Sequence, residues 1–279
     1  SYPNPPFDEF QLRNDIELAA SVSGNITGDI AGNTGSVGKI DVGRVFRVQA
    51  GSGMFYSSIV GNIVVPIDAR VPSSGEVAIR AVRATNSIRG DVNARGHITS
   101  IQVGAFEDSE GISGRIISSG GSIGEIRSSG PISIATTGDT PGIYARRSID
   151  LVFAGPTVGD PNEPSEPRDI EAVIKCGLSD DPPNDPESLF DLLKKVRTGG
   201  NLTRPIFTQR LGYGYYELYR VEDRGIYVDG TIEEPITITE SAKYAEIVGD
   251  TFGPNATVSI GRMLKGRIEA TNAANGYIP

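Results

Sequence analysis

The stretch Ser87-Ile-Arg-Gly-Asp-Val92 is one copy of a short phrase that recurs along this chain. In each copy an Ile stands two positions before a glycine, and a second β-branched residue stands two positions after it. The other full copies are Asn25-Ile-Thr-Gly-Asp-Ile30, Ser58-Ile-Val-Gly-Asn-Ile63 and Gly111-Ile-Ser-Gly-Arg-Ile116. A strand this short cannot bury its apolar face alone, so it must stack on copies of itself. The phrase therefore predicts a solenoid and not a two-layer domain.

The spacing of the phrases predicts the length of one coil. Ile88 and Ile112 are 24 residues apart, and Ile112 and Ile132 are 20 apart. Ile98 and Ile123, which like Ile132 begin shorter variants, are 25 apart. Two phrases per coil thus predict coils of this length, each with two or three short strands that stack on the next coil at about 4.8 Å. This arrangement is a parallel β-helix.

We expect four segments along the chain. They are an extended N-terminal arm with a capping strand at 1–23, the β-helix repeats at 24–154, a Pro-rich insertion at 155–204, and a continued β-helix or small C-terminal β region at 205–279. The insertion departs from the phrase pattern that its flanks keep. It is therefore interpreted as an excursion between two coils.

One α-helix is predicted inside the insertion, from Glu187 to Arg197. Asp185 is a suitable N-cap, Pro186 suits the first helical position, and Gly199-Gly200 is a stop signal. The apolar residues of this segment are Leu189, Phe190, Leu192, Leu193 and Val196. We expect the helix to pack on the same molecule. The predicted fold class is all-β, a parallel β-helix (solenoid) with one inserted α-helix.

Residues 24–154 resemble the right-handed parallel β-helix (pectate-lyase-like) superfamily, and resemble in texture the Gly- and Ser-rich solenoids of secreted and cell-surface bacterial proteins. That superfamily contains pectate lyases, polygalacturonases, phage tailspikes and non-catalytic adhesins, so the resemblance implies a fold without choosing a function. Lyase-type members carry an Arg-x-Pro-x-x-Arg phrase, and here Arg204-Pro205 is the only Arg-Pro. Polygalacturonase-type members carry Gly-His-Gly, whereas Gly96-His97 is followed by Ile98. These departures favour a protein without enzymatic activity.

Composition excludes several classes of partner. Lys and Arg number 26 against 35 Asp and Glu, and the net charge of -9 repels phosphate backbones and anionic lipid. No apolar run approaches the roughly 20 residues of a membrane span. Nucleic acid and membrane insertion are therefore excluded. The single cysteine and single histidine rule out an internal disulfide and a His-cluster metal site. An acidic, Gly-rich solenoid favours an extracellular or cell-surface location.

Two segments carry candidate binding residues. The first has clustered carboxylates at Asp180, Asp181, Asp185 and Glu187. Such hard oxygen ligands suit Ca²⁺ if they converge, although a solvated turn with helix N-terminal charge is the alternative. The second is an aromatic patch at Tyr213, Tyr215, Tyr216 and Tyr219. Its rings would stack on a sugar or pack against the predicted helix. No cofactor is expected other than Ca²⁺.

Basic residues recur beside the phrases and permit two interpretations. They form either a groove for an acidic polysaccharide or an outward ladder that pairs with carboxylates such as Asp91, Glu125 and Asp150 of neighbouring coils. We favour the ladder because the chain as a whole is acidic. His97, beside a strand start, is interpreted as structural. Cys176 follows an apolar run and is interpreted as a buried, inert thiol.

The N-terminal segment alternates apolar and polar residues, which predicts a strand with one buried face. Its candidate assembly residues are Phe10, Leu12, Ile16 and Leu18. This strand either caps the first coil or adds to a neighbouring molecule. The predicted function is a structural or adhesive β-solenoid that assembles head to tail into a filament or layer, with itself or an extracellular polysaccharide as partner. The alternative is a β-helix that binds polysaccharide or degrades it as a lyase or glycoside hydrolase.

Overall fold

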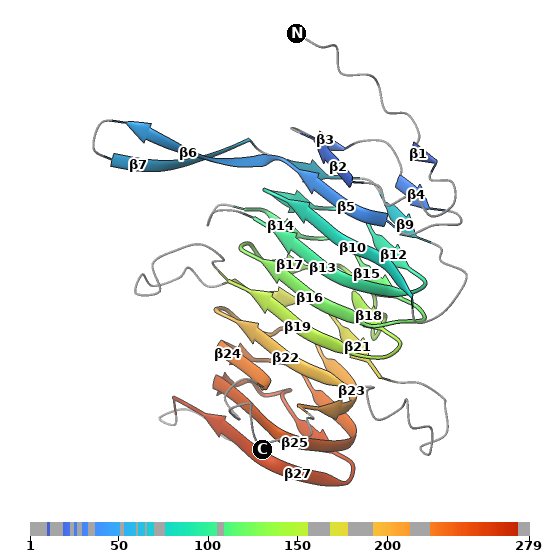
Figure 1. Cartoon of the computed structure of the whole chain (residues 1–279). Coiled ribbons are helices and arrows are strands. Elements are labelled where there is room, and N and C mark those ends of the chain that lie inside the picture. The colour runs from blue at the N-terminus through green and yellow to red at the C-terminus, as the bar shows by residue number, and fades with distance from the viewer. Residues whose placement is uncertain are drawn as a thin grey trace.

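The described part of the chain consists of strands. A computed structural model describes residues 10–11, 19–22, 25–26, 30–32, 37–50, 53–59, 61–64, 66–69, 76–104, 109–155, 168–177, 192–212 and 224–272. Within these ranges there is no helix, and every strand pairing is parallel except one hairpin. The strands form a 19-stranded sheet, a 6-stranded sheet and the hairpin (Figure 1).

The 19-stranded sheet falls into two columns of stacked strands, which we call column A and column B. Column A contains β2 (Ala19–Val22), β5 (Val37–Val42), β10 (Val77–Ala84), β13 (His97–Val103), β16 (Ile123–Ser128), β19 (Ile149–Ala154), β22 (Leu193–Thr198), β24 (Gly225–Ile232), the second part of β25 (Ile236–Phe252) and β27 (Met263–Ala270). Column B contains β1 (Phe10–Gln11), β4 (Ile30–Gly32), β9 (Ile67–Ala69), β12 (Val92–Ala94), β15 (Ile116–Ser118), β18 (Ile143–Ala145), β21 (Ile174–Cys176), β23 (Ile206–Leu211), the first part of β25 and β26 (Val258–Ile260).

The 6-stranded sheet is a third column, column C. It contains β3 (Asn25–Ile26), β8 (Asn62–Ile63), β11 (Ser87–Ile88), β14 (Gly111–Ile112), β17 (Ile132–Ser133) and β20 (Ile170–Glu171). Single bridges at Leu202 and Ile232 extend it. From β10 to β22 the chain visits the columns in the constant order A, C, B, and we call one such passage a rung.

The pairing register agrees with the spacing of the sequence phrases. Ile88 pairs with Ile112, and Ile112 pairs with Ile132. Ile98 pairs with Ile123 in column A. The three residue pairs whose separations predicted the coil length are therefore paired neighbours in adjacent rungs.

The core lies between the three columns and is built from repeated β-branched residues. In column C the isoleucines at positions 63, 88, 112, 132 and 170 lie in register and are almost fully buried. β-branched side chains pack well on such a pleated, buried surface. Burying one isoleucine contributes about 1.5–3 kcal/mol, so the ladder supplies much of the stabilisation of the stack.

Glycine is required where the chain turns between columns. Gly111 has φ 81°, in the left-handed region that L side chains rarely adopt. A Cβ atom built there would lie 1.9 Å from the carbonyl oxygen of Pro131 in the next rung. The close backbone approach therefore depends on the absence of a side chain at this corner.

The predicted helix from Glu187 to Arg197 is wrong. Leu193–Thr198 is strand β22, paired with β19 and β24, and residues 187–191 lie outside the described part. Leu193 and Val196 point inward, and Lys194 and Lys195 occupy the two positions between them. An inward spacing of three residues resembles one turn of a helix. Tertiary stacking on Ile149 and Val152 of β19 decides in favour of the strand.

The N-terminal segment contributes to two columns. β1 lies in column B and β2 in column A. Phe10 begins β1, whereas Leu12, Ile16 and Leu18 lie outside the described residues. After β5, the antiparallel hairpin of β6 (Arg44–Ala50) and β7 (Gly53–Ile59) projects sideways from the stack (Figure 1). Pairing in column A resumes beyond it, where Val82 of β10 lies beside Ile40 of β5.

Candidate functional site

Outward residues of column A form a ladder of alternating cations and aromatic rings. Arg127 on β16 is in register with Phe153 on β19, which is in register with Arg197 on β22 and then Tyr227 on β24. They face outward because their neighbours along each strand are buried core residues. The Arg127 guanidinium lies 5.9 Å from the centre of the Phe153 ring. Cation–π contact of this kind contributes about 0.5–1 kcal/mol at an exposed site.

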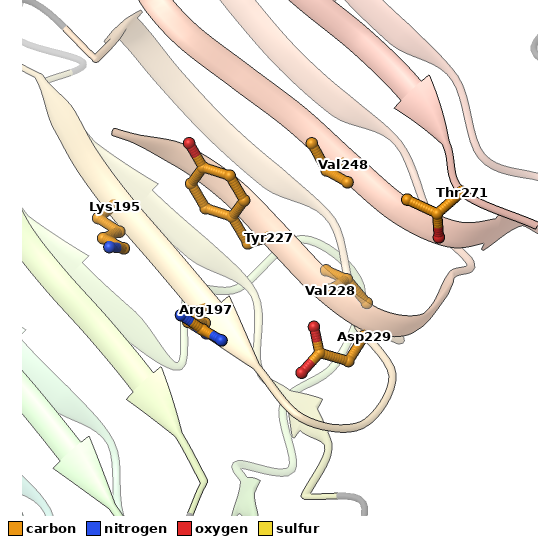
Figure 2. A pocket seen from close by; sticks show the side chains of 7 residues that line it. All are labelled: Lys195, Arg197, Tyr227, Val228, Asp229, Val248 and Thr271. Atoms are coloured by element: carbon orange, nitrogen blue, oxygen red, sulfur yellow. The ribbon is translucent and has the colours of Figure 1, made fainter. Parts of the chain in front are cut away.

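The C-terminal end of this ladder borders an open pocket of about 290 Å³. It is lined by Lys195, Arg197, Tyr227, Val228, Asp229, Val248 and Thr271. Figure 2 shows that the two cations come from β22, the tyrosine and the aspartate from β24, and the valine at position 248 from β25, with Thr271 just after β27. Four successive strands of column A therefore build the pocket.

Tyr227 is held in place within the pocket. Its hydroxyl donates a hydrogen bond to the carbonyl oxygen of Arg224 at 2.9 Å. The Lys195 ammonium lies 5.6 Å from the centre of its ring. The ring is thus oriented by its own strand, and a positive charge borders its face.

The two pocket cations differ from most of the charges around them. Lys194 pairs with Asp150 at 2.7 Å, and Arg267 donates to both Glu246 oxygens at 2.9 and 3.2 Å. Among the described residues, neither Lys195 nor Arg197 forms an ion pair. Asp229 lines the same pocket without a salt bridge to either of them. The residues that line the pocket therefore carry two positive charges and one negative charge, and the Asp250 carboxylate lies beside them, where it accepts the hydrogen bond of the Thr271 hydroxyl.

Glu125 is a fixed carboxylate farther along the same face. It accepts hydrogen bonds from Ser100 Oγ at 2.9 Å, Gln102 Nε2 at 2.9 Å and Arg127 Nε at 2.8 Å. Burial raises the pKa of this carboxyl, and the hydrogen bonds, led by that from Arg127, lower it by more, so its pKa lies below the ordinary value. A general acid needs a raised pKa, so Glu125 is suited to a structural role and not to proton donation.

The residues predicted as sites from the sequence lie mostly outside the described part. This holds for Asp180, Asp181, Asp185 and Glu187 and for Tyr213, Tyr215, Tyr216 and Tyr219. The calcium and sugar-stacking assignments remain predictions. Within the described ranges, no group of three or more His, Cys, Asp or Glu residues is placed to hold a metal ion.

His97 and Cys176 have structural surroundings. The Nδ1 atom of His97 accepts a hydrogen bond from the Ser122 amide at 2.9 Å, which links adjacent rungs. Cys176 is fully buried in a ladder of small residues between Ala145 and Thr208, and its Sγ lies 3.4 Å from the Thr208 hydroxyl oxygen. The prediction of a buried thiol is confirmed.

The predicted outward ladder of ion pairs is confirmed in part. Arg115 forms two hydrogen bonds to the Asp91 carboxylate, at 2.9 and 2.7 Å, across adjacent rungs. Glu125 pairs instead with Arg127 on its own strand. Asp150 pairs with a lysine of the next rung, and not with an arginine. Exposed pairs of this kind contribute little each, so the isoleucine core and not the ladder holds the rungs together.

The two cations of the pocket, Lys195 and Arg197, lie in the segment that the sequence predicted to be a helix. A usable signal was present, because Leu193-x-x-Val196-x-Thr198 repeats the pattern Ile123-x-x-Ile126-x-Ser128. Matching these two phrases would have placed Lys195 and Arg197 on the outward face.

Comparisons with known proteins found no matching family model, no similar curated protein and no similar solved structure. The resemblance to pectate-lyase-like proteins therefore remains a prediction. Among the described residues, no helix has the length and apolar character that crossing a bilayer requires.

Proposed function

We propose that the chain is a parallel β-helix that acts as a structural or adhesive element outside the cell and lengthens by stacking end to end. The constant order of the three columns and the in-register isoleucine ladder support the helical arrangement. The acidic charge and the Gly-rich composition support an extracellular location. The exposed face of the last described rung is the observation that carries the proposal of end-to-end stacking.

On the last described rung, inward-facing apolar residues are exposed. Leu264 on β27 is 45% exposed, although Ala242, its partner in the previous rung, is buried. Ile268 is only partly buried, whereas its partner Ile247 is 1% exposed. Among the described strands, β27 pairs on one side only. A further parallel strand in register would bury these side chains and satisfy the free edge.

The opposite end of the stack offers compatible edges. Among the described strands, β1, β2 and β3 each pair on one side only, one in each column. All strands of a column run in the same direction, so a second copy that continues the stack would pair in parallel. A head-to-tail contact of this kind does not close on itself, and it propagates into a filament.

Sedimentation velocity over a series of protein concentrations tests the proposal. We expect the wild type to form concentration-dependent oligomers and Leu264→Asp to stay monomeric, because a charge on the end face opposes stacking. Ser113→Asp adds the same charge at an exposed turn in the middle of the stack and should assemble like the wild type. A wild type that stays monomeric at hundreds of micromolar, or a Leu264→Asp variant that assembles normally, would overturn the proposal.

Binding of polysaccharide is the second candidate function. The observation that favours it is the pocket on column A, with an oriented tyrosine and two cations that form no ion pair among the described residues. A scaffold that displays such a pocket would be adhesive without being catalytic.

A further inference from the structure

We propose that the column A pocket binds one anionic sugar unit, a saccharide ring that carries a carboxylate or a sulfate. This inference rests on the second candidate function, polysaccharide binding, and names the class of sugar that the pocket would bind; it does not depend on end-to-end stacking. It depends on three features of the pocket: its charge, its aromatic wall and its polar rim.

The charge of the pocket selects an acidic group. Lys195 and Arg197 flank Val196, whose complete burial turns both cations to the outer face of β22. Neither is neutralised by an ion pair within the described part of the chain. A guanidinium donates two parallel hydrogen bonds to a carboxylate or sulfate, and an ammonium beside it adds a point charge. The two cations are therefore available for an anionic ligand.

The aromatic wall favours a sugar ring over a small inorganic anion. The Tyr227 ring is oriented by the hydrogen bond from its hydroxyl to Arg224, and Val248 lies beside it in the next rung (Figure 2). A pyranose has an apolar C–H face that packs on aromatic and aliphatic surface, whereas a free sulfate or phosphate ion gains nothing from it. The acidic group and the ring would thus be recognised by adjacent parts of the same pocket.

The polar rim and the size of the pocket complete the match. Asp229 accepts hydrogen bonds, and the Thr271 hydroxyl, which donates its proton to Asp250 at 3.1 Å, keeps lone pairs that can accept one from a sugar hydroxyl. The volume of about 290 Å³ lies at the lower end for small-molecule sites and suits one ring.

Calorimetric titration with short oligosaccharides tests the inference. The ligands are a uronic-acid oligomer, a sulfated oligomer, a neutral glucose oligomer of equal length, inorganic sulfate and a single-stranded oligonucleotide. We expect binding of at least one acidic sugar, no measurable binding of the neutral one, and weaker binding as salt is added. Preference between the uronic acid and the sulfated oligomer identifies the acidic group.

Two matched variants locate the site. Arg197→Gln should weaken binding of the acidic sugar about tenfold or more, because a charge-assisted hydrogen bond is lost. Lys194→Gln removes one charge from the adjacent position of the same strand, outside the pocket, and should bind nearly as well as the wild type. Both should melt like the wild type, since Arg197 is exposed and the half-exposed ion pair of Lys194 with Asp150 contributes little. Equal losses in the two variants, equal binding of the neutral oligomer, or tighter binding of sulfate or the oligonucleotide would overturn the inference.

Discussion

Replacement of Ile126 by alanine tests whether stacked isoleucines hold the rungs together. Ile126 is fully buried in β16, between Ile101 of the previous rung and Val152 of the next. The substitution removes three carbon groups at about 0.8 kcal/mol each, or about 2.4 kcal/mol. The rungs on either side are fixed by their own pairings and cannot close the space, so a cavity term adds to this loss. We expect a total of about 3–4 kcal/mol, within the range for buried Ile-to-Ala changes.

Urea unfolding followed by far-ultraviolet circular dichroism measures this loss. Ile268→Ala is the matched control, because Ile268 occupies the same ladder in the last rung and is only partly buried. Its loss should be less than half as large. A loss below about 1 kcal/mol for Ile126→Ala, or equal losses in both variants, would refute the idea that packing between rungs dominates the stability.

Three further predictions concern single positions. Gly111→Ala should destabilise the chain by well over 1 kcal/mol, because it combines a positive φ with a clash against the Pro131 carbonyl. Gly138→Ala, at a positive φ but with open space around the added Cβ, should destabilise it by about 1 kcal/mol. Equal losses of stability in urea melts would contradict this reasoning. Because the pKa of Glu125 is lowered in the folded protein, its ionised form stabilises the fold above the unfolded pKa, and this contribution is lost as pH falls through the folded pKa. Glu125→Gln should therefore reduce the drop in melting temperature between about pH 5 and pH 3. An unchanged drop would show that Glu125 contributes nothing to this acid sensitivity. The Cys176 thiol should react with a chromogenic disulfide reagent only in denaturant, and rapid labelling of the native protein would show that the small-residue ladder opens.

The strand pairings could be predicted where each rung repeats the phrase or a shorter variant of it. Ile88 and Ile112 begin full copies of the phrase and Ile132 begins a shorter variant, and the distance between these isoleucines equals the length of a rung. A parallel stack in register places equivalent residues beside each other, so a sequence period translates directly into a contact. Prediction therefore succeeded for the pairs in the regular middle of the chain.

The helix could not be excluded from local sequence, because strands such as β22 place two outward residues between two inward ones. Leu193 and Val196 then have a spacing of three, which an amphipathic helix shares. The pocket was harder still to predict. Its cations on β22 are in register with Gly225 and Tyr227 of β24, and this register depends on how much sequence separates the strands. The sequence of residues 199–224 contains no motif that predicts the register between β22 and β24.

The register of the rungs also determines how the protein would respond to tension. Val82, Ile101, Ile126 and Val152 are successive partners in column A, separated by 19 to 26 residues. Since each rung contacts only its neighbours, a pull on one end detaches the outermost rung and leaves the others paired. Each detached rung releases about 65–90 Å of extended chain. A protein built in this way lengthens in steps under load. Each step can be reversed, because the detached strands can pair again with the exposed edge of the rung that remains.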